Sequence, residues 1–323
     1  MATSTVSTTQ ISRRTLLRCG GLATTGLAAP AILTPQQKQD LKIFMHWDLD
    51  GASGILTREQ AWWWEPNVRE RVAAEARELM TADVNAGTRA ALEAGAGQLI
   101  VLDTHHGGGN LYADKLVQDH RVMYHLHSVG MQNGKKRWMP NLDETVHGLM
   151  LPGHHAKTGT LGAFLPHAWT LQWKDFQING QSVGEIGIEA CFAGHWDIPV
   201  IFVQGDVAAC QEARELFPWI VTSVVKWGTD SPEVCRGLSP DSAYKETARG
   251  IAEAIARLRA GEMRPYKPRL PMTITIRMAT MDAAAAAAQR PGVRRVDDHI
   301  VEARIGRQAD VVKWINGTGL EMV

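Results

Sequence analysis

Short apolar runs alternate with longer helical patterns along this chain, and several runs end in glycine-rich segments that carry acidic or histidine side chains. Residues 41–47 and 98–102 are predicted to form buried strands, and residues 67–94 between them have apolar positions at helical spacing. A strand, a helix and a second strand form a βαβ unit, which normally gives parallel strands with a right-handed crossover. The alternation therefore predicts an α/β fold.

The middle of the chain continues this alternation and adds a hairpin signal, because the apolar run 173–178 is followed by Asn179-Gly180. A hairpin introduces antiparallel pairing, so we expect a three-layer body around a mixed, largely parallel sheet. The other elements predicted for this body are strands at 147–151 and 199–204 and helices at 183–196 and 240–260.

The tail has a pattern of its own. Residues 264–271 are rich in proline and basic residues, and strands are predicted at 272–278 and 299–305, with an alanine-rich helix capped by Asp282 between them. We interpret residues 32–268 as a metal-binding catalytic domain and residues 269–323 as a small C-terminal α/β lobe.

The first residues resemble a signal for export. Arg13-Arg14 lie in a twin-arginine pattern and are followed by a weakly apolar stretch from Cys19 to Ala29 with small residues at its end. We predict a signal over residues 1–31 and a periplasmic or extracellular mature protein. The alternative is a disordered or amphipathic N-terminus with two chance arginines. The apolar stretch is too short and glycine-rich for stable membrane insertion as a transmembrane helix.

Charge and cysteine usage exclude some classes of protein. Lysine plus arginine equals aspartate plus glutamate at 34 each, with no basic stripe interleaved with aromatics, so nucleic acid is not an expected partner. Cys191, Cys210 and Cys235 have no paired spacing, so no disulfide framework is implied. The run from Trp62 to Trp64 suggests an interface or a lid.

Two carboxylates follow the first predicted strand. Asp48 and Asp50 are two residues apart, and side chains at this spacing share a face of a strand, so both can enter one cleft. The alternative is a solvated turn before Gly51.

Histidine pairs follow two other predicted strands, His105-His106 after 98–102 and His154-His155 after 147–151. One member of each pair is a candidate metal ligand, and Asp103 could orient an imidazole. The alternative is that they are histidines of surface loops.

Glu185 lies in the first turn of a predicted helix, where a carboxylate often only compensates the helix dipole. Together, however, these carboxylates and imidazoles suit one or two divalent ions of the zinc or manganese kind. The residues alone therefore predict a metallohydrolase.

These segments resemble the D-aminopeptidase (DppA-type) family of zinc metallopeptidases over residues 41–323. The blocks that carry the resemblance, in the family's order, are residues 42–54, 103–105, 153–156, 165–167 and 178–187. One departure is Asp50, because the family usually has glutamate there, one methylene longer. The interval from His155 to His167 is also one residue longer than usual.

The resemblance implies a site of two zinc ions per chain, which manganese or cobalt could replace, and His167 as the catalytic histidine. It also implies ring-like homo-oligomers. The ligands implied are Asp48, Asp50, His105, His155 and Glu185.

The function expected is hydrolysis of short peptides or amino-acid amides with a free amino end, with a preference for D-residues. One alternative is an exported metal-dependent amidohydrolase acting on lactams, cyclic dipeptides or other small amides. Another is a non-catalytic metal-binding assembly protein, which the shorter Asp50 would favour.

Overall fold

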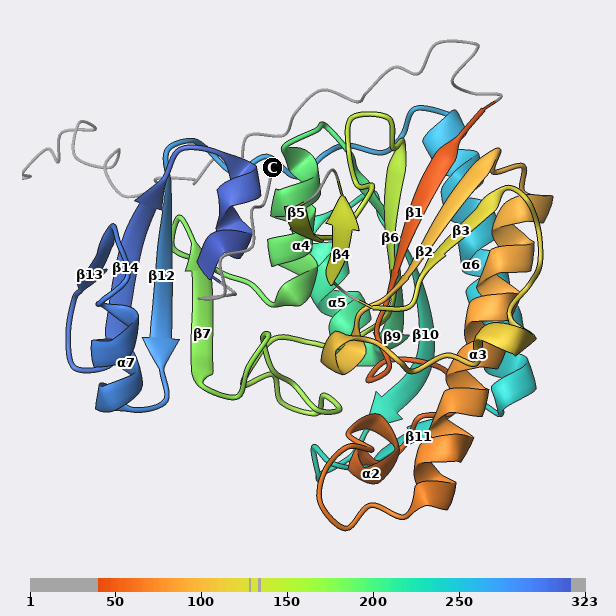
Figure 1. Ribbon diagram of the computed structural model, residues 1–323, viewed down its shortest axis with the longest axis horizontal. Helices are drawn as coiled ribbons and strands as arrows, with labels where there is room; N and C mark the ends of the chain where they lie inside the picture. The colour runs from red at the N-terminus through yellow and green to blue at the C-terminus, as the bar shows by residue number, and fades with distance from the viewer. Residues whose placement is uncertain (1–39, 128, 133–134, 315–323) are drawn as a thin grey trace, which may run out of the picture.

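The computed structural model describes residues 40–127, 129–132 and 135–314, and it contains the expected α/β body (Figure 1). In the described part of the chain, seven strands form the main sheet in the order β11-β10-β9-β6-β1-β2-β3. Neighbouring strands are parallel except for β11 on β10. The strands are β1 (Lys42–Trp47), β2 (Gln98–Asp103), β3 (Val122–His125), β6 (Gly148–His154), β9 (Val200–Asp206), β10 (Val221–Gly228) and β11 (Cys235–Gly237).

Helices cover both faces of this sheet. They are needed on both because successive side chains of a strand point to opposite faces, and the buried strands carry apolar side chains on each. Phe44 of β1 belongs to one apolar cluster, whereas Ile43 and Met45 belong to another on the opposite face. The first face is covered by α4 (Glu185–Gly194) and α5 (Val207–Leu216), and the second by α3 (Glu70–Glu93) and α6 (Pro240–Arg259). The prediction of a three-layer body around a mixed, largely parallel sheet is confirmed.

A second, antiparallel sheet packs beyond α4, at the end of the molecule away from α3 and α6 (Figure 1). Its strand order among the described residues is β13-β14-β12-β7-β8. The C-terminal segment supplies β12 (Met272–Met278), α7 (Met281–Ala287), β13 (Val293–Arg295) and β14 (Ile300–Ile305). The predicted hairpin supplies β7 (Trp173–Ile178) and β8 (Gln181–Ser182), so this sheet combines two distant parts of the chain. The domain boundary at residue 268 stays a prediction.

The cap of α7 differs from the prediction. Thr280, and not Asp282, occupies the N-cap, because its side-chain oxygen accepts a hydrogen bond from the Ala283 backbone N–H. Asp282 is the second residue of the helix and lies in its first turn.

The remaining described elements are short. They are α2 (Arg58–Ala61), β4 (Val129–Gln132), β5 (Lys135–Trp138) and the 3₁₀ turns η1 (His105–Gly107), η2 (Ala113–Lys115) and η3 (Gln308–Trp314). No helix of the described residues is long and apolar enough to cross a membrane. The predicted export signal, residues 1–31, lies outside the described residues.

Candidate metal centre

Three adjacent strands of the main sheet, β6, β1 and β2, bring their carboxyl ends to one edge. Asp48 follows β1, His105 follows β2 and His155 follows β6. Glu185 is the first residue of α4. Ligands in open α/β sheets bind at this edge, so the fold places the sequence-predicted side chains where chemistry is expected.

Two glycines allow the loops after β1 and β6 to touch. The Gly51 backbone N–H donates to the Gly153 carbonyl at 2.6 Å. A Cβ on Gly153, whose φ is +77°, would lie 1.9 Å from the Asp48 carbonyl oxygen, and one on Gly51 would lie 2.1 Å from the His154 carbonyl oxygen. Only glycine fits at either position, so the contact between these loops depends on both.

The first group of metal donors consists of Asp48, Asp50 and His105, whose candidate ligand atoms all lie within 4.8 Å of one another. His105 Nε2 is 2.8 Å from the Ala61 carbonyl oxygen, which can only accept, so Nε2 carries a hydrogen. The other ring nitrogen, Nδ1, faces Asp48 Oδ1 at 3.0 Å. An imidazole whose second nitrogen is fixed by a carbonyl is the usual arrangement of a metal ligand.

The second group consists of Asp48, His155 and Glu185, also within 4.8 Å of one another. His155 Nδ1 is 3.2 Å from the Ala156 carbonyl oxygen, and His155 Nε2 is 3.3 Å from Glu185 Oε1. Asp48 is the member common to both groups. Because a carboxylate has two oxygens, Asp48 could offer an oxygen to an ion in each group.

Buried atoms without partners support a fit to metal ions. Asp50 Oδ2 and His155 Nε2 are buried and have no hydrogen-bond partner among the described residues. Buried polar atoms are nearly always satisfied, and an ion is one of the recognised explanations when they are not. The donor chemistry, carboxylate and imidazole, suits zinc as well as cobalt or manganese.

The charges of the site reinforce one another. Burial opposes ionisation of Asp48 and Glu185, but the nearby His105 and His155 outweigh it, so the pKa of Asp48 falls below its usual range and that of Glu185 falls to about 2. Burial likewise opposes protonation of His105, yet the carboxylates of Asp50 and Asp48 raise its pKa to about 9. The carboxylates thus hold positive charge strongly, whether a proton or a divalent ion supplies it.

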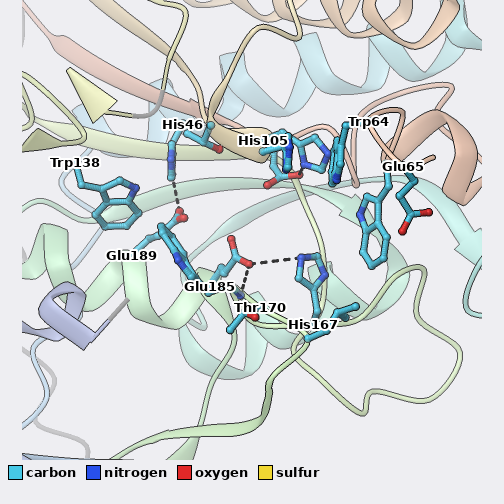
Figure 2. Close-up of a pocket in the computed structure, with 16 residues that line it drawn as sticks. His46, Trp64, Glu65, His105, Trp138, His167, Thr170, Glu185 and Glu189 are labelled. Atoms are coloured by element: carbon cyan, nitrogen blue, oxygen red, sulfur yellow. Dashed lines mark hydrogen bonds and ion pairs between the residues drawn. The ribbon is translucent and has the colours of Figure 1, made fainter. Parts of the chain in front are cut away.

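His167 faces the same site without being part of the two groups that share Asp48 (Figure 2). Its ring stacks on His155 at 3.9 Å between centroids, and its Nε2 lies 3.8 Å from Asp50 Oδ2 and 3.9 Å from Glu185 Oε1. Its Nδ1 donates to the Leu165 carbonyl at 2.8 Å. Burial first, and then the charge of His155, lower the pKa of His167, so a neutral ring presents the lone pair of Nε2 to the site.

A cavity of about 380 Å³ opens beside these residues, and tryptophans form part of its wall. Trp62 Nε1 donates to Asp50 Oδ1 at 3.1 Å, Trp63 Nε1 donates to Asn110 Oδ1 at 2.8 Å, and Trp64 stacks on His106 at 3.7 Å. The tryptophan run, interpreted from the sequence as an interface or a lid, therefore fixes the loops around the site. Whether it also forms an interface stays a prediction.

Two sequence-predicted residues have other roles. His106 stacks on Trp64 and belongs to neither group that shares Asp48. Asp103 does not orient an imidazole, because its two oxygens accept from the backbone N–H and side-chain amide of Asn110 at 2.7 and 2.8 Å. Asn110 in turn donates to the His105 carbonyl, so Asp103 holds the glycine-rich loop that carries His105.

Sequence reasoning missed Lys226 of β10 altogether. This lysine is 1% exposed, and its ammonium donates to the carbonyl oxygens of Asp50 and Ile55 at 2.8 and 2.6 Å. It therefore anchors the loop that carries both aspartates. No local pattern marks it, because its partners are far away in the sequence. His46 and Glu189, also not predicted, line the cavity as well.

Three comparisons with known proteins give consistent results. The family model described as D-aminopeptidase matches residues 41–317. A D-aminopeptidase of Bacillus subtilis (strain 168) is 29% identical over 253 residues, which cover 78% of this chain and 86% of that protein. The solved structure titled "Zn-dependent D-aminopeptidase DppA from Bacillus subtilis, a self-compartmentalizing protease" matches with a TM-score of 0.75 and 26% identity, over 85% of this chain and 95% of that one.

Proposed function

Because the chain belongs to the D-aminopeptidase family, we propose that it is a zinc metallopeptidase. Its proposed substrates are short peptides or amino-acid amides with a free amino end, and it would prefer D-residues to L-residues. The observation that carries the proposal is the pair of donor groups that share Asp48, with His167 stacked on His155 and its Nε2 directed at Asp50 and Glu185. The relatives with similar sequence and structure are a D-aminopeptidase and a zinc-dependent D-aminopeptidase.

Two ions per chain are proposed. Asp48, Asp50 and His105 would hold one ion, and Asp48, His155 and Glu185 would hold the other. Bound zinc supplies Lewis acidity, which polarises a scissile carbonyl and makes water more acidic.

The protein's own residues then position and move the proton. His167 is neutral, with Nδ1 fixed by the Leu165 carbonyl, so its Nε2 can accept a proton from water and return it to the departing amine. Trp62 fixes the carboxylate of Asp50, and Lys226 fixes its backbone. The cavity of about 380 Å³ suits a small substrate.

The test of this function is a panel of matched amides assayed with zinc-loaded protein. We expect D-alanine amide and D-Ala-D-Ala to be cleaved faster than their L counterparts. N-acetylation should lower kcat/KM by more than about 100-fold, because a site built around a charged amine rejects an analogue that lacks it. Chelation should abolish hydrolysis, and zinc should restore it.

Other outcomes of the same panel separate the alternatives. Equal hydrolysis of acetylated amides, lactams or cyclic dipeptides would replace the aminopeptidase by a broader amidohydrolase. Zinc-loaded protein that hydrolyses none of them would support a metal-binding assembly protein. Faster cleavage of the L substrates would contradict the D-preference alone.

We further propose that the chain assembles into ring-like homo-oligomers and that its mature form is periplasmic or extracellular. The first part is supported by the solved relative, which is described as a self-compartmentalizing protease. The second is supported by the twin-arginine pattern, which lies outside the described residues.

Replacing Arg13 and Arg14 together with lysine is expected to leave unprocessed protein in the cytoplasm, because twin-arginine signals are read through this pair. Cell fractionation and the apparent mass of the product measure the effect. Arg18→Lys, a change of the same kind outside the pair, is the control and should be exported. Export of the double variant with normal cleavage would remove the assignment.

A further inference from the structure

A second cluster of histidine and carboxylate lies beside the metal centre and is formed by His46, His154 and Glu189. Figure 2 shows two of its members, His46 and Glu189, joined by a dashed line. All three side chains are at most 1% exposed. They come from the same three segments that supply Asp48, His155 and Glu185. His46 lies on β1, two residues before Asp48, and His154 directly precedes His155 at the end of β6. Glu189 lies on α4, one turn after Glu185.

The ring nitrogens converge on one oxygen. His46 Nδ1 is 2.8 Å and His154 Nε2 is 2.9 Å from the same atom, Glu189 Oε2. His154 Nδ1 is 3.3 Å from the Pro152 carbonyl oxygen and donates to it, as His155 Nδ1 does to the Ala156 carbonyl. His154 Nε2 therefore faces a carboxylate oxygen at hydrogen-bond distance, where either a proton or a cation can lie between the two atoms.

Several atoms of the cluster are not explained by hydrogen bonds. His46 Nδ1 is close to Glu189 Oε2 but lacks hydrogen-bond geometry, and it has no other partner among the described residues. His46 Nε2 and Glu189 Oε1 are buried and without a hydrogen-bond partner within the same set of residues. Such atoms, nine-tenths buried or more, are costly unless something else binds there.

We propose that His46, His154 and Glu189 form a third divalent-cation site, distinct from the two sites that share Asp48. Its candidate ligand atoms lie within 4.8 Å of one another. Two histidines and one glutamate are a ligand set of zinc enzymes that leave the fourth position open. His46 and Glu189 line the cavity, so the open position faces the space for substrate.

The experiment is a zinc content measurement combined with anomalous diffraction at the zinc edge, on protein equilibrated with zinc and freed of excess. In the wild type we expect an anomalous peak at about 2.0–2.2 Å from His46 Nδ1, His154 Nε2 and a Glu189 oxygen, in addition to the peaks at the Asp48 centre. Glu189→Gln removes the charged donor with little change of shape and should lose this peak alone, with one zinc fewer per chain.

His46→Phe is the second variant, because it keeps a ring of similar size and removes both nitrogens. It should lose the same peak. Glu253→Gln, a change of the same kind on the exposed face of α6 where Glu253 pairs with Arg249, is the control and should keep the wild-type content.

Two results would overturn the inference. One is a wild type with ions at the Asp48 centre and none in the His46 cluster, which would mean that protons hold the cluster together. The other is a peak that survives both variants. The inference does not depend on aminopeptidase activity, and an Asp48 centre without ions would count against the proposed function instead.

Discussion

Replacing Asp48 with alanine is expected to remove zinc from both donor groups and to lower kcat/KM by at least about 1,000-fold. Asp48 is the one residue common to the two groups, so its loss takes a ligand from each. Metal Lewis acidity contributes several kcal/mol to transition-state stabilisation, which corresponds to this factor. Zinc content and kcat/KM measured on the same preparation give the result.

The controls for Asp48→Ala distinguish a lost ligand from a general loss of charge. Asp230→Ala removes an exposed carboxylate and should leave both quantities unchanged. Asp50→Glu restores the residue that the family usually has, and we expect it to hold zinc at least as well as the wild type. If Asp48→Ala retains the full zinc content, Asp48 is not the shared ligand.

Replacing His167 with alanine is expected to lower kcat by about 100- to 10,000-fold, the range for loss of a general acid–base group, while most of the zinc remains. The reason is that His167 faces both donor groups through Nε2 without completing either. Zinc content, kcat and KM should be measured together. His120→Ala, at a histidine whose side chain is 92% exposed, is the control.

A parallel loss of zinc and activity in His167→Ala would make His167 a ligand. This outcome is possible because Asp50, His155 and His167 form a further group of candidate ligand atoms within 4.8 Å of one another. Near-normal turnover would exclude both roles. In that case His106, which also lines the cavity, is the next residue to replace.

The local sequence pattern was sufficient to predict the central strands β1, β2, β6 and β9 of the main sheet and the place of its site, but not β3, β10 or β11. The strands β1, β2 and β6 each contain a short apolar run, and parallel strands end at one edge, so Asp48, His105 and His155 could be expected to meet there. The structure brings them together with Glu185 and His167. Their individual roles as ligands and catalyst stay predictions.

Long-range pairing was not predictable in the same way. The partner of β7 is β12, about a hundred residues later, and nothing in either run specifies the other. Lys226 is similar, because a lysine within a strand gives no sign that the carbonyl of Asp50 will be its partner. By contrast, the cluster of His46 and Glu189 had a usable signal. His46 is two residues from Asp48 at the end of a strand, and Glu189 is four residues from Glu185 on a helix. Side chains at these spacings share a face of the strand or helix.

The buried amine of Lys226 fastens the loop of Asp48 and Asp50, because it donates to the carbonyl oxygens of Asp50 and Ile55. Together with the contact between Gly51 and Gly153, it holds this loop through backbone atoms, without using the side-chain oxygens of the two aspartates. Small zinc domains unfold without their metal, because binding and folding are one event. Here the loop that carries the ligands has hydrogen bonds of its own, so we expect the protein to stay folded when zinc is removed and to bind zinc again when it is restored.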